Sequence, residues 1–370
     1  MSSHERPLFE ETEKEPKLEF PNGREAIPKE IDTVFWDVDG TITAKEVVDQ
    51  YILKIILETA NNGVKHNFVT GRDRFWLIEN LKIPLVKAAE EENLDANKVL
   101  SSMGFYPELG LISLDPISDQ PEVYPEVLNH RLTSGSFRER IASFFLQEKD
   151  LQKVENSNVP PRNYVIKDAN GVQFLFPMIS SELNTTIKLP DFIWSETKEV
   201  IGTAELVRDV ERRVTPARQA KIILAAEIVN KFLSYWEADR DITLSPVSTA
   251  INIAPIVDGI PLDKDWAAGR IIQHKQHELA KSNVNITLEE ISQKSIGIGD
   301  GYADFLFSRP RIGRDRYLDV ALVYVGPSDQ IHKDEDKTKN LAIKSENYQG
   351  PKATLDALKI LKDHFVQKAE

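Results

Sequence analysis

Residues 33–43, Thr-Val-Phe-Trp-Asp-Val-Asp-Gly-Thr-Ile-Thr, constrain the fold more than any other stretch of the chain. An apolar run ends there at two acidic residues, Asp37 and Asp39, which one position separates and Gly40 follows. Such a run is typical of a strand buried on both faces of a parallel sheet, and Asp-Gly is a strong turn signal. Ligands of open α/β sheets bind at the carboxyl ends of the strands, so the two acids are candidates for chemistry.

The two acids also pose an electrostatic question, because no basic residue lies in this stretch. Like charges this close are costly unless a cation or a bound proton relieves them. A simpler interpretation is an acidic turn in which Asp39 and Thr41 cap the following helix. The rest of the chain has to decide between a catalytic turn and a capping turn.

The order of strand, polar turn and helix occurs twice in the first part of the chain. Apolar residues recur at helical spacing from Val47 onward and predict a helix, which Asn61-Asn62-Gly63 is expected to end. A second strand, 64–69, leads into Thr70-Gly71-Arg72, and a helix from about Asp73 is expected to be interrupted at Pro84. Two further strands are predicted at 99–103 and 109–114.

The pattern changes at about residue 116, where proline and turn residues become frequent. The sequence predicts a helix at 136–149, a hairpin at 164–176 with Asn170-Gly171 as its turn, strands at 184–189 and 243–257, and a long amphipathic helix at 216–237. Alternation then resumes with a helix at 265–281, a strand at 295–299, an acid-rich turn at 300–304, a strand at 320–325 and a helix from about 353. An α/β sheet domain interrupted by an α+β insertion explains this order.

We therefore expect four segments. Residues 1–29, rich in Glu, Lys and Pro, are expected to form a disordered tail. Residues 30–115 and 258–370 are expected to form the two parts of the core, and residues 116–257 the insertion. At 370 residues with 41% hydrophobic residues, the chain has enough apolar material for a core.

Composition excludes several classes of function. A formal charge of −13 argues against a general binder of nucleic acid or anionic membranes. The absence of cysteine excludes disulfides, thiolate metal sites and thiol nucleophiles and suits a cytoplasmic protein. No apolar run approaches the roughly 20 residues that span a bilayer, and the N-terminus has no apolar signal-peptide core. We expect a soluble, unexported protein.

Four distant stretches place polar residues at a strand end or a helix start, and they contain the residues Asp37/Asp39, Thr70, Lys264 and Asp300/Asp304. Strand ends of a parallel sheet converge on one edge, so these groups could meet. Together they offer a carboxylate nucleophile, a second carboxyl group to carry a proton, a hydroxyl, an ammonium and further acids for a cation. That set suits phosphoryl transfer through an aspartyl-phosphate.

The four stretches resemble the ordered motifs of the haloacid-dehalogenase-like (HAD) phosphohydrolases. The motifs are Phe35-Trp36-Asp37-Val38-Asp39-Gly40-Thr41-Ile42-Thr43, Val69-Thr70-Gly71-Arg72, Lys264 before a helix, and Gly299-Asp300-Gly301-Tyr302-Ala303-Asp304. The resemblance implies a Rossmann-like parallel-sheet core. The insertion between the second and third motifs resembles the large α+β cap of the subgroup with sucrose-phosphate phosphatase, phosphomannomutase and the Cof-type sugar phosphatases.

The resemblance also implies roles. Asp37 would be the nucleophile, and Asp39 would protonate the leaving oxygen and later activate water. Thr70, Gly71 and Lys264 would bind the phosphoryl oxygens. Mg²⁺ would lie on Asp37, Asp300 and the backbone carbonyl of Asp39, with Asp304 orienting the site from outside the metal's ligand set.

Two positions depart from the family pattern. Asp265 follows Lys264 where the family commonly has glycine, which makes Lys294 an alternative for the phosphate-binding lysine. Ala303 stands where an asparagine is usual, which removes an amide near the metal.

The sequence thus predicts a Mg²⁺-dependent phosphatase acting on a small phosphorylated metabolite, most plausibly a sugar phosphate. Arg72, Arg208 and Arg212 are candidates for binding the anionic substrate, although the last two alternate with acids as on a solvated surface. Two alternatives stay open. One is a phosphomannomutase-like phosphosugar mutase, and the other is a sugar-phosphate-binding regulator without turnover.

Overall fold

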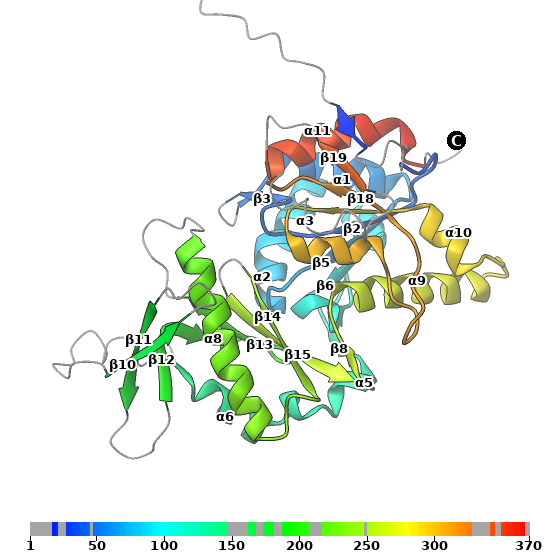
Figure 1. Ribbon diagram of the computed structural model, residues 1–370. Helices are drawn as coiled ribbons and strands as arrows, with labels where there is room; N and C mark the ends of the chain where they lie inside the picture. Colours follow the sequence, from blue (N-terminus) through cyan, green and yellow to red (C-terminus); the bar gives the residue numbers. More distant parts are fainter. Residues whose placement is uncertain are drawn as a thin grey trace, which may run out of the picture.

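The computed structural model describes residues 17–20, 27–44, 47–146, 162–167, 173–180, 187–206, 216–247, 250–327, 341–344 and 349–366. Two large sheets dominate these residues, and each is covered by helices (Figure 1). Within these ranges, no helix has the length and apolar character needed to cross a membrane.

The first sheet has the strand order β1-β19-β18-β17-β2-β5-β6-β7-β8. Its central strands, from β19 to β6, are parallel, whereas β1, β7 and β8 pair antiparallel at the edges. The strands are β1 (Leu18–Glu19), β2 (Thr33–Trp36), β5 (Lys65–Val69), β6 (Met103–Tyr106), β7 (Ile112–Leu114), β8 (Pro121–Val123), β17 (Ser295–Gly299), β18 (Ala321–Tyr324) and β19 (Leu341–Lys344). β2, β17 and β18 are buried along their whole length, as the apolar runs predict.

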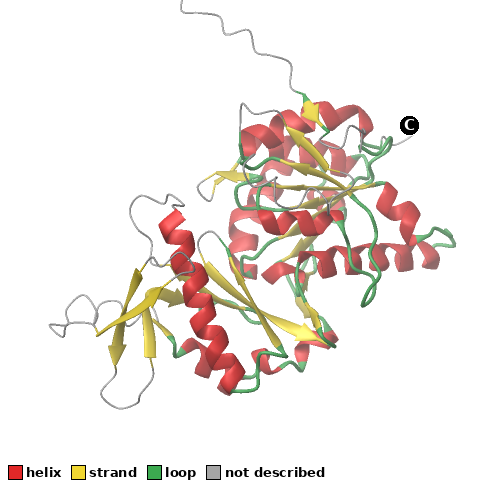
Figure 2. Cartoon of the chain, viewed as in Figure 1, coloured by secondary structure: helices red, strands yellow, loops and turns green. Residues whose placement is uncertain are grey.

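Helices cover both faces of this sheet (Figure 2). Val34 and Trp36 of β2 pack on one face with α1 and α11, and Phe35 packs on the other face with α9. This alternation is the two-residue period of a strand buried on both sides. The helices are α1 (Gln50–Asn61), α2 (Arg74–Leu77), α3 (Ile83–Glu91), α4 (Ala96–Leu100), α9 (Lys264–Lys281), α10 (Leu288–Gln293) and α11 (Pro351–Leu361). The predicted α/β Rossmann-like core is confirmed.

The second sheet is formed by the insertion, between β8 and α9. It has the order β10-β11-β12-β13-β15-β14, with antiparallel pairs along this path. α8 packs against β14 and β15 and shares with them a separate hydrophobic core. The helices and strands of the insertion are α5 (Pro125–Leu128), α6 (Gly135–Ala142), β9 (Phe145–Leu146), β10 (Arg162–Lys167), β11 (Gln173–Ser180), β12 (Ile187–Trp194), β13 (Gly202–Leu206), α8 (Pro216–Tyr235), β14 (Ile242–Pro246), β15 (Ala250–Val257) and β16 (Ile260–Pro261). The α+β insertion is therefore confirmed, and its predicted hairpin consists of β10 and β11.

Several local predictions need correction. The strand predicted at 99–103 is wrong at its start, because Asp95 accepts the amide of Lys98 and so caps the helix α4, which contains Val99 and Leu100. Leu109, predicted to begin a strand, has φ +62° in a 3₁₀ turn, Glu108–Gly110. The helix predicted at 136–149 is shorter, since α6 ends at Ala142 and the strand β9 follows.

Pro84 does not interrupt its helix. α2 continues through a π-helical turn, Ile78–Lys82, into α3, where Pro84 lies in the first turn. The amide of Ile83 bonds to the carbonyl of Ile78, five residues back. The wider turn lets the chain pass a residue that has no N–H to donate.

Short strands also lie where none was predicted. Val47 and Val48, read as the start of a helix, form β4, which pairs with β3 (Thr43–Ala44). The helix α1 begins only after Asp49, whose carboxylate accepts the amides of Tyr51 and Ile52. Leu18 and Glu19, within the segment expected to be a tail, form β1 and pair with β19.

Candidate active site

Three strand ends meet at one edge of the first sheet. β2 lies between β17 and β5, and all three run parallel. Asp37, Asp300 and Thr70 each follow the last residue of one of these strands. The amide of Asp37 donates to the carbonyl of Ile298 at 3.0 Å, which fixes the first acid against the neighbouring strand. The predicted convergence of these residues is therefore present.

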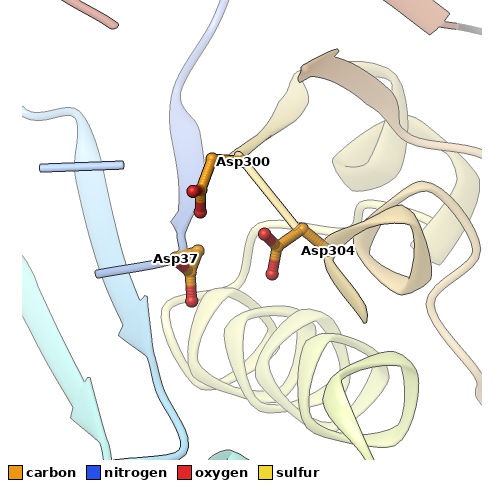
Figure 3. Close-up of side chains that lie close together, drawn as sticks. All are labelled: Asp37, Asp300 and Asp304. Carbon is orange, nitrogen blue, oxygen red and sulfur yellow. The ribbon is translucent and has the colours of Figure 1, made fainter. Parts of the chain in front are cut away.

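A cluster of three carboxyl groups occupies this edge. One carboxylate oxygen from each of Asp37, Asp300 and Asp304 lies within 4.8 Å of the others. Figure 3 shows the three side chains close together, with Asp37 on the β2 side and Asp304 in the helical turn after β17. The acid-rich turn of the sequence thus brings its two acids to the first motif.

Lys264, the first residue of α9, joins this cluster. Its Nζ lies 2.6 Å from Asp37 Oδ1 and 2.6 Å from Asp304 Oδ1, and all three side chains are buried. The second oxygen of Asp304 accepts the amide of Gly301 at 2.7 Å. With both oxygens bonded to the protein, Asp304 is suited to orienting Lys264 and the turn.

The cluster carries more negative than positive charge. Burial, followed by the charges of Asp304 and Asp300, raises the pKa of Asp37 well above its usual value, against the opposing effect of Lys264. Burial and the charge of Asp304 raise the pKa of Asp300 to about 7. Burial would lower the pKa of Lys264, but the charges of Asp304 and Asp37 outweigh it and raise that pKa above its usual range.

With all groups ionised, three carboxylates and one ammonium leave a formal charge of −2 in a buried space. Converging carboxylate oxygens are what a hard divalent cation such as Mg²⁺ prefers, and its charge would offset this surplus. The residues present therefore fit the magnesium ion that the resemblance implies.

Asp39 lies apart from the cluster, in a pair with Arg72. Arg72 Nε is 2.9 Å from Asp39 Oδ2, and Arg72 Nη2 is 2.8 Å from Asp39 Oδ1. The guanidinium also lies 4.7 Å from the ring centroid of Trp76. The bidentate bond from Arg72 holds the second acid in a defined orientation. The predicted contact of Arg72 with substrate stays a prediction.

The turn between the two acids requires glycine. Gly40 has φ +79°, and a Cβ there would lie 2.2 Å from Asp300 Oδ2. Thr41, considered only as a helix cap, lies with its Oγ1 3.3 Å from Asp37 Oδ2 and 3.2 Å from Asp300 Oδ1. The capping interpretation is wrong, because α1 begins at Gln50 with Asp49 as its cap. Sequence reasoning missed the contact of Thr41 because only the fold brings residue 300 to it.

Thr70 and Gly71 follow the end of β5, the strand that pairs with β2. Thr70 is buried, and its Oγ1 accepts the amide of Arg72 at 3.2 Å. Its carbonyl accepts the amide of Leu109 at 2.7 Å. The loop is thus held by backbone bonds from the 3₁₀ turn that follows β6.

The unusual Asp265 does not disturb Lys264. Its carboxylate accepts a bond from Arg311 Nε at 2.7 Å, which neutralises it away from the cluster. The alternative lysine, Lys294, precedes β17 at the opposite end of that strand and pairs with Glu30. Lys264 is therefore the lysine placed at the candidate site, whereas Arg208 and Arg212 lie outside the described residues.

Comparisons with known proteins give matches to solved structures alone. No protein-family model and no curated protein sequence matches the chain. One similar structure is the C-terminal domain of trehalose-6-phosphate phosphatase from C. albicans, with 16% identity and a TM-score of 0.49 over 90% of this chain and 92% of that one. Another is trehalose-6-phosphate phosphatase from Aspergillus fumigatus, with 15% identity and a TM-score of 0.42 over 91% and 94%. A haloacid dehalogenase-like hydrolase from Bacteroides thetaiotaomicron has 10% identity and a TM-score of 0.43 over 90% and 100%.

These identities and TM-scores are low, so we take the function from the geometry of the site. At the level of fold, the chain has the arrangement that the resemblance implies. The first, second and fourth motifs lie at strand ends of a parallel core sheet, Lys264 begins α9, and an α+β insertion separates the second and third motifs.

Proposed function

We propose that this protein is a Mg²⁺-dependent phosphatase of small phosphorylated metabolites that works through an aspartyl-phosphate at Asp37. The observation that carries the proposal is the difference between the two acids of the first motif. Asp37 bonds to Lys264 inside the buried acidic cluster, whereas Asp39 is held apart by Arg72. This difference supports assigning Asp37 as the nucleophile and Asp39, outside the cluster, as the proton carrier.

Asp37, Asp300 and the backbone carbonyl of Asp39 would hold the magnesium ion. When bound, the ion would polarise the phosphoryl group and offset its charge. Lys264 supplies a fixed ammonium that is already oriented by Asp304, so its field costs no reorganisation during the reaction. Thr70 and Gly71 would bind the remaining phosphoryl oxygens.

In the first step an oxygen of Asp37 attacks phosphorus, the ester P–O bond breaks, and the leaving oxygen takes the proton of Asp39. In the second step water attacks the phosphorus of the aspartyl-phosphate and passes a proton to Asp39. Inorganic phosphate leaves, and both carboxyl groups return to their starting states. Between the two steps Asp39 is ionised, and this is the form that the bidentate bond from Arg72 stabilises.

Asp37→Asn tests this function, because it removes the nucleophile and keeps the size of the side chain. A panel of phosphorylated metabolites, sugar phosphates first, is assayed for phosphate release with Mg²⁺ and with EDTA. We expect release by the wild-type protein that needs Mg²⁺ and is abolished in the variant. Undiminished release by Asp37→Asn would refute the proposal. A sugar bisphosphate assayed in parallel separates a phosphatase, which releases phosphate, from a mutase, which yields isomeric monophosphates.

A further inference from the structure

A buried lysine of the cap bonds to the loop of the second motif. Lys198 lies in the segment 195–201, between β12 and β13, and its side chain is 7% exposed. Its Nζ donates to the carbonyl of Gly71 at 2.7 Å and to Thr203 Oγ1 at 2.8 Å. Thr203 Oγ1 in turn donates to Asn252 Oδ1 at 3.0 Å. A residue of the cap is therefore bonded to the backbone of the second motif.

A carboxylate of the core holds the same cap segment. The side chain of Glu108 is buried and accepts the amides of Glu199 at 2.7 Å, Val200 at 2.7 Å and Ile201 at 2.9 Å. Glu108 has φ +52°, a conformation rarely adopted by residues other than glycine. The cap thus donates four hydrogen bonds to the core: one from the ammonium of Lys198 to a backbone carbonyl, and three from backbone amides to the carboxylate of Glu108.

Each of the three backbone carbonyls of the loop 70–72 accepts a hydrogen bond from a different residue. The carbonyl of Thr70 accepts the amide of Leu109 at 2.7 Å, and that of Arg72 accepts the amide of Glu108 at 2.9 Å. Both donors belong to the core. The middle carbonyl, that of Gly71, is held by Lys198 of the cap.

The bond to Gly71 acts on a single peptide group. The peptide between Gly71 and Arg72 carries the carbonyl that Lys198 holds and the amide that Thr70 Oγ1 accepts at 3.2 Å. The orientation of this peptide group determines the direction in which the side chain of Arg72 leaves the backbone, and that side chain binds Asp39. A glycine on one side leaves this peptide free to rotate when the bond to the cap is absent.

We propose that Lys198 is a positioning residue: docking of the cap through Lys198 and Glu108 fixes the Gly71–Arg72 peptide and thereby places Arg72 against Asp39. The proton carrier is then correctly oriented only when the cap is docked over the site. This inference rests on the proposed function for the role of Asp39, but the hold of Lys198 on the loop can be tested without any turnover.

The surroundings of Lys198 suit a group that must be desolvated to act. Burial lowers the pKa of Lys198 to about 8. The charge of Arg72 also lowers this pKa, whereas the charges of Glu205, Glu108 and Asp73 raise it. The guanidinium of Arg138 lies nearby and donates to the backbone carbonyl of Lys198. Deprotonation weakens Lys198 as a donor, so turnover is expected to fall as the pH rises through about 8.

The first test is hydrogen exchange at the Arg72 amide, comparing wild type, Lys198→Met and Lys87→Met. Lys87 is an exposed lysine of α3 that serves as the matched control. We expect faster exchange in Lys198→Met alone. Thr203→Val, a smaller change that removes the second partner of Lys198, is expected to act in the same direction and guards against misfolding of the first variant. Unchanged exchange in both folded variants overturns the proposal.

The second test uses phosphate esters with Mg²⁺ and compares p-nitrophenyl phosphate with an alkyl phosphate. An alkoxide needs the proton of Asp39 far more than nitrophenolate does. Lys198→Met is therefore expected to lower kcat for the alkyl ester by about a hundredfold, with a much smaller effect on the aryl ester and on KM. The alkaline fall near pH 8 is expected to be absent from the variant.

Equal losses for both esters would mean that Lys198 serves the fold alone and would overturn the positioning role. Full activity of Asp37→Asn is a different outcome. It would refute the proposed function, whereas the exchange measurement would still decide whether Lys198 holds the loop.

Discussion

Lys264→Met isolates the electrostatic role of the lysine in the acidic cluster. The substitution keeps the length of the side chain but removes an ammonium that lies 2.6 Å from Asp37 Oδ1 and 2.6 Å from Asp304 Oδ1. The formal charge of the cluster then changes from −2 to −3. Removing one partner of a buried ion pair costs about 3–5 kcal/mol, so we expect a loss of stability of that order. Loss of a preorganised positive charge is expected to lower kcat by about 10²–10³-fold.

Lys275→Met provides a matched control on the same helix. Lys275 Nζ lies 2.6 Å from Asp32 Oδ1, at the opposite end of β2 from Asp37, and its side chain is 19% exposed. Urea unfolding and phosphate release are measured for both variants with and without Mg²⁺. We expect Mg²⁺ to restore part of the stability of Lys264→Met, and Lys275→Met to retain activity. The reasoning fails if Lys264→Met unfolds like the wild type, or if both variants lose activity alike.

Two further predictions concern the turn and the cluster. Gly40→Ala adds a Cβ 2.2 Å from Asp300 Oδ2 at φ +79°, so we expect a destabilisation of about 1–3 kcal/mol and weakened Mg²⁺ binding by calorimetry; unchanged binding would contradict this placement of Asp300. Burial raises the pKa of Asp300 from 3.8 to about 7, so the folded state holds this proton more tightly than the unfolded state. The stability measured as the urea midpoint in EDTA should therefore fall as the pH rises from about 4 to about 7, and Mg²⁺ should make this fall smaller. A urea midpoint that rises over this range in EDTA would contradict the buried cluster.

The sequence predicted those parts of the fold whose signals are local and strong. The buried run before Asp37 and the strand before Asp300 are continuous apolar segments, and parallel pairing brings their ends together without any further information. For the same reason the meeting of Asp37 and Asp300 could be predicted from strand ends, and Asp304 follows four residues later in the turn after β17. The division of the chain into domains at the predicted boundaries stays a prediction.

Other features depend on contacts that a linear pattern does not contain. Val99 and Leu100 are equally apolar in a helix or a strand, and the cap at Asp95 decides between them. The pairing of Arg72 with Asp39 and of Asp265 with Arg311 joins residues 33 and 46 positions apart. Lys198 had no sequence signal at all, since its partner is a backbone carbonyl 127 positions away.

The most direct test of the central claim is to look for the phosphoryl group on Asp37. Asp39→Ala removes the group that activates water, so the covalent form should accumulate from p-nitrophenyl phosphate, whose leaving group needs little help from the proton of Asp39. The protein is mixed with substrate and Mg²⁺, quenched in acid, digested and analysed by mass spectrometry. The account predicts a hydroxylamine-labile phosphoryl group on the peptide that contains Asp37, and none in Asp37→Asn. A phosphoryl group on another residue, or phosphate release by the wild type with no phosphorylated peptide in either protein, would contradict it.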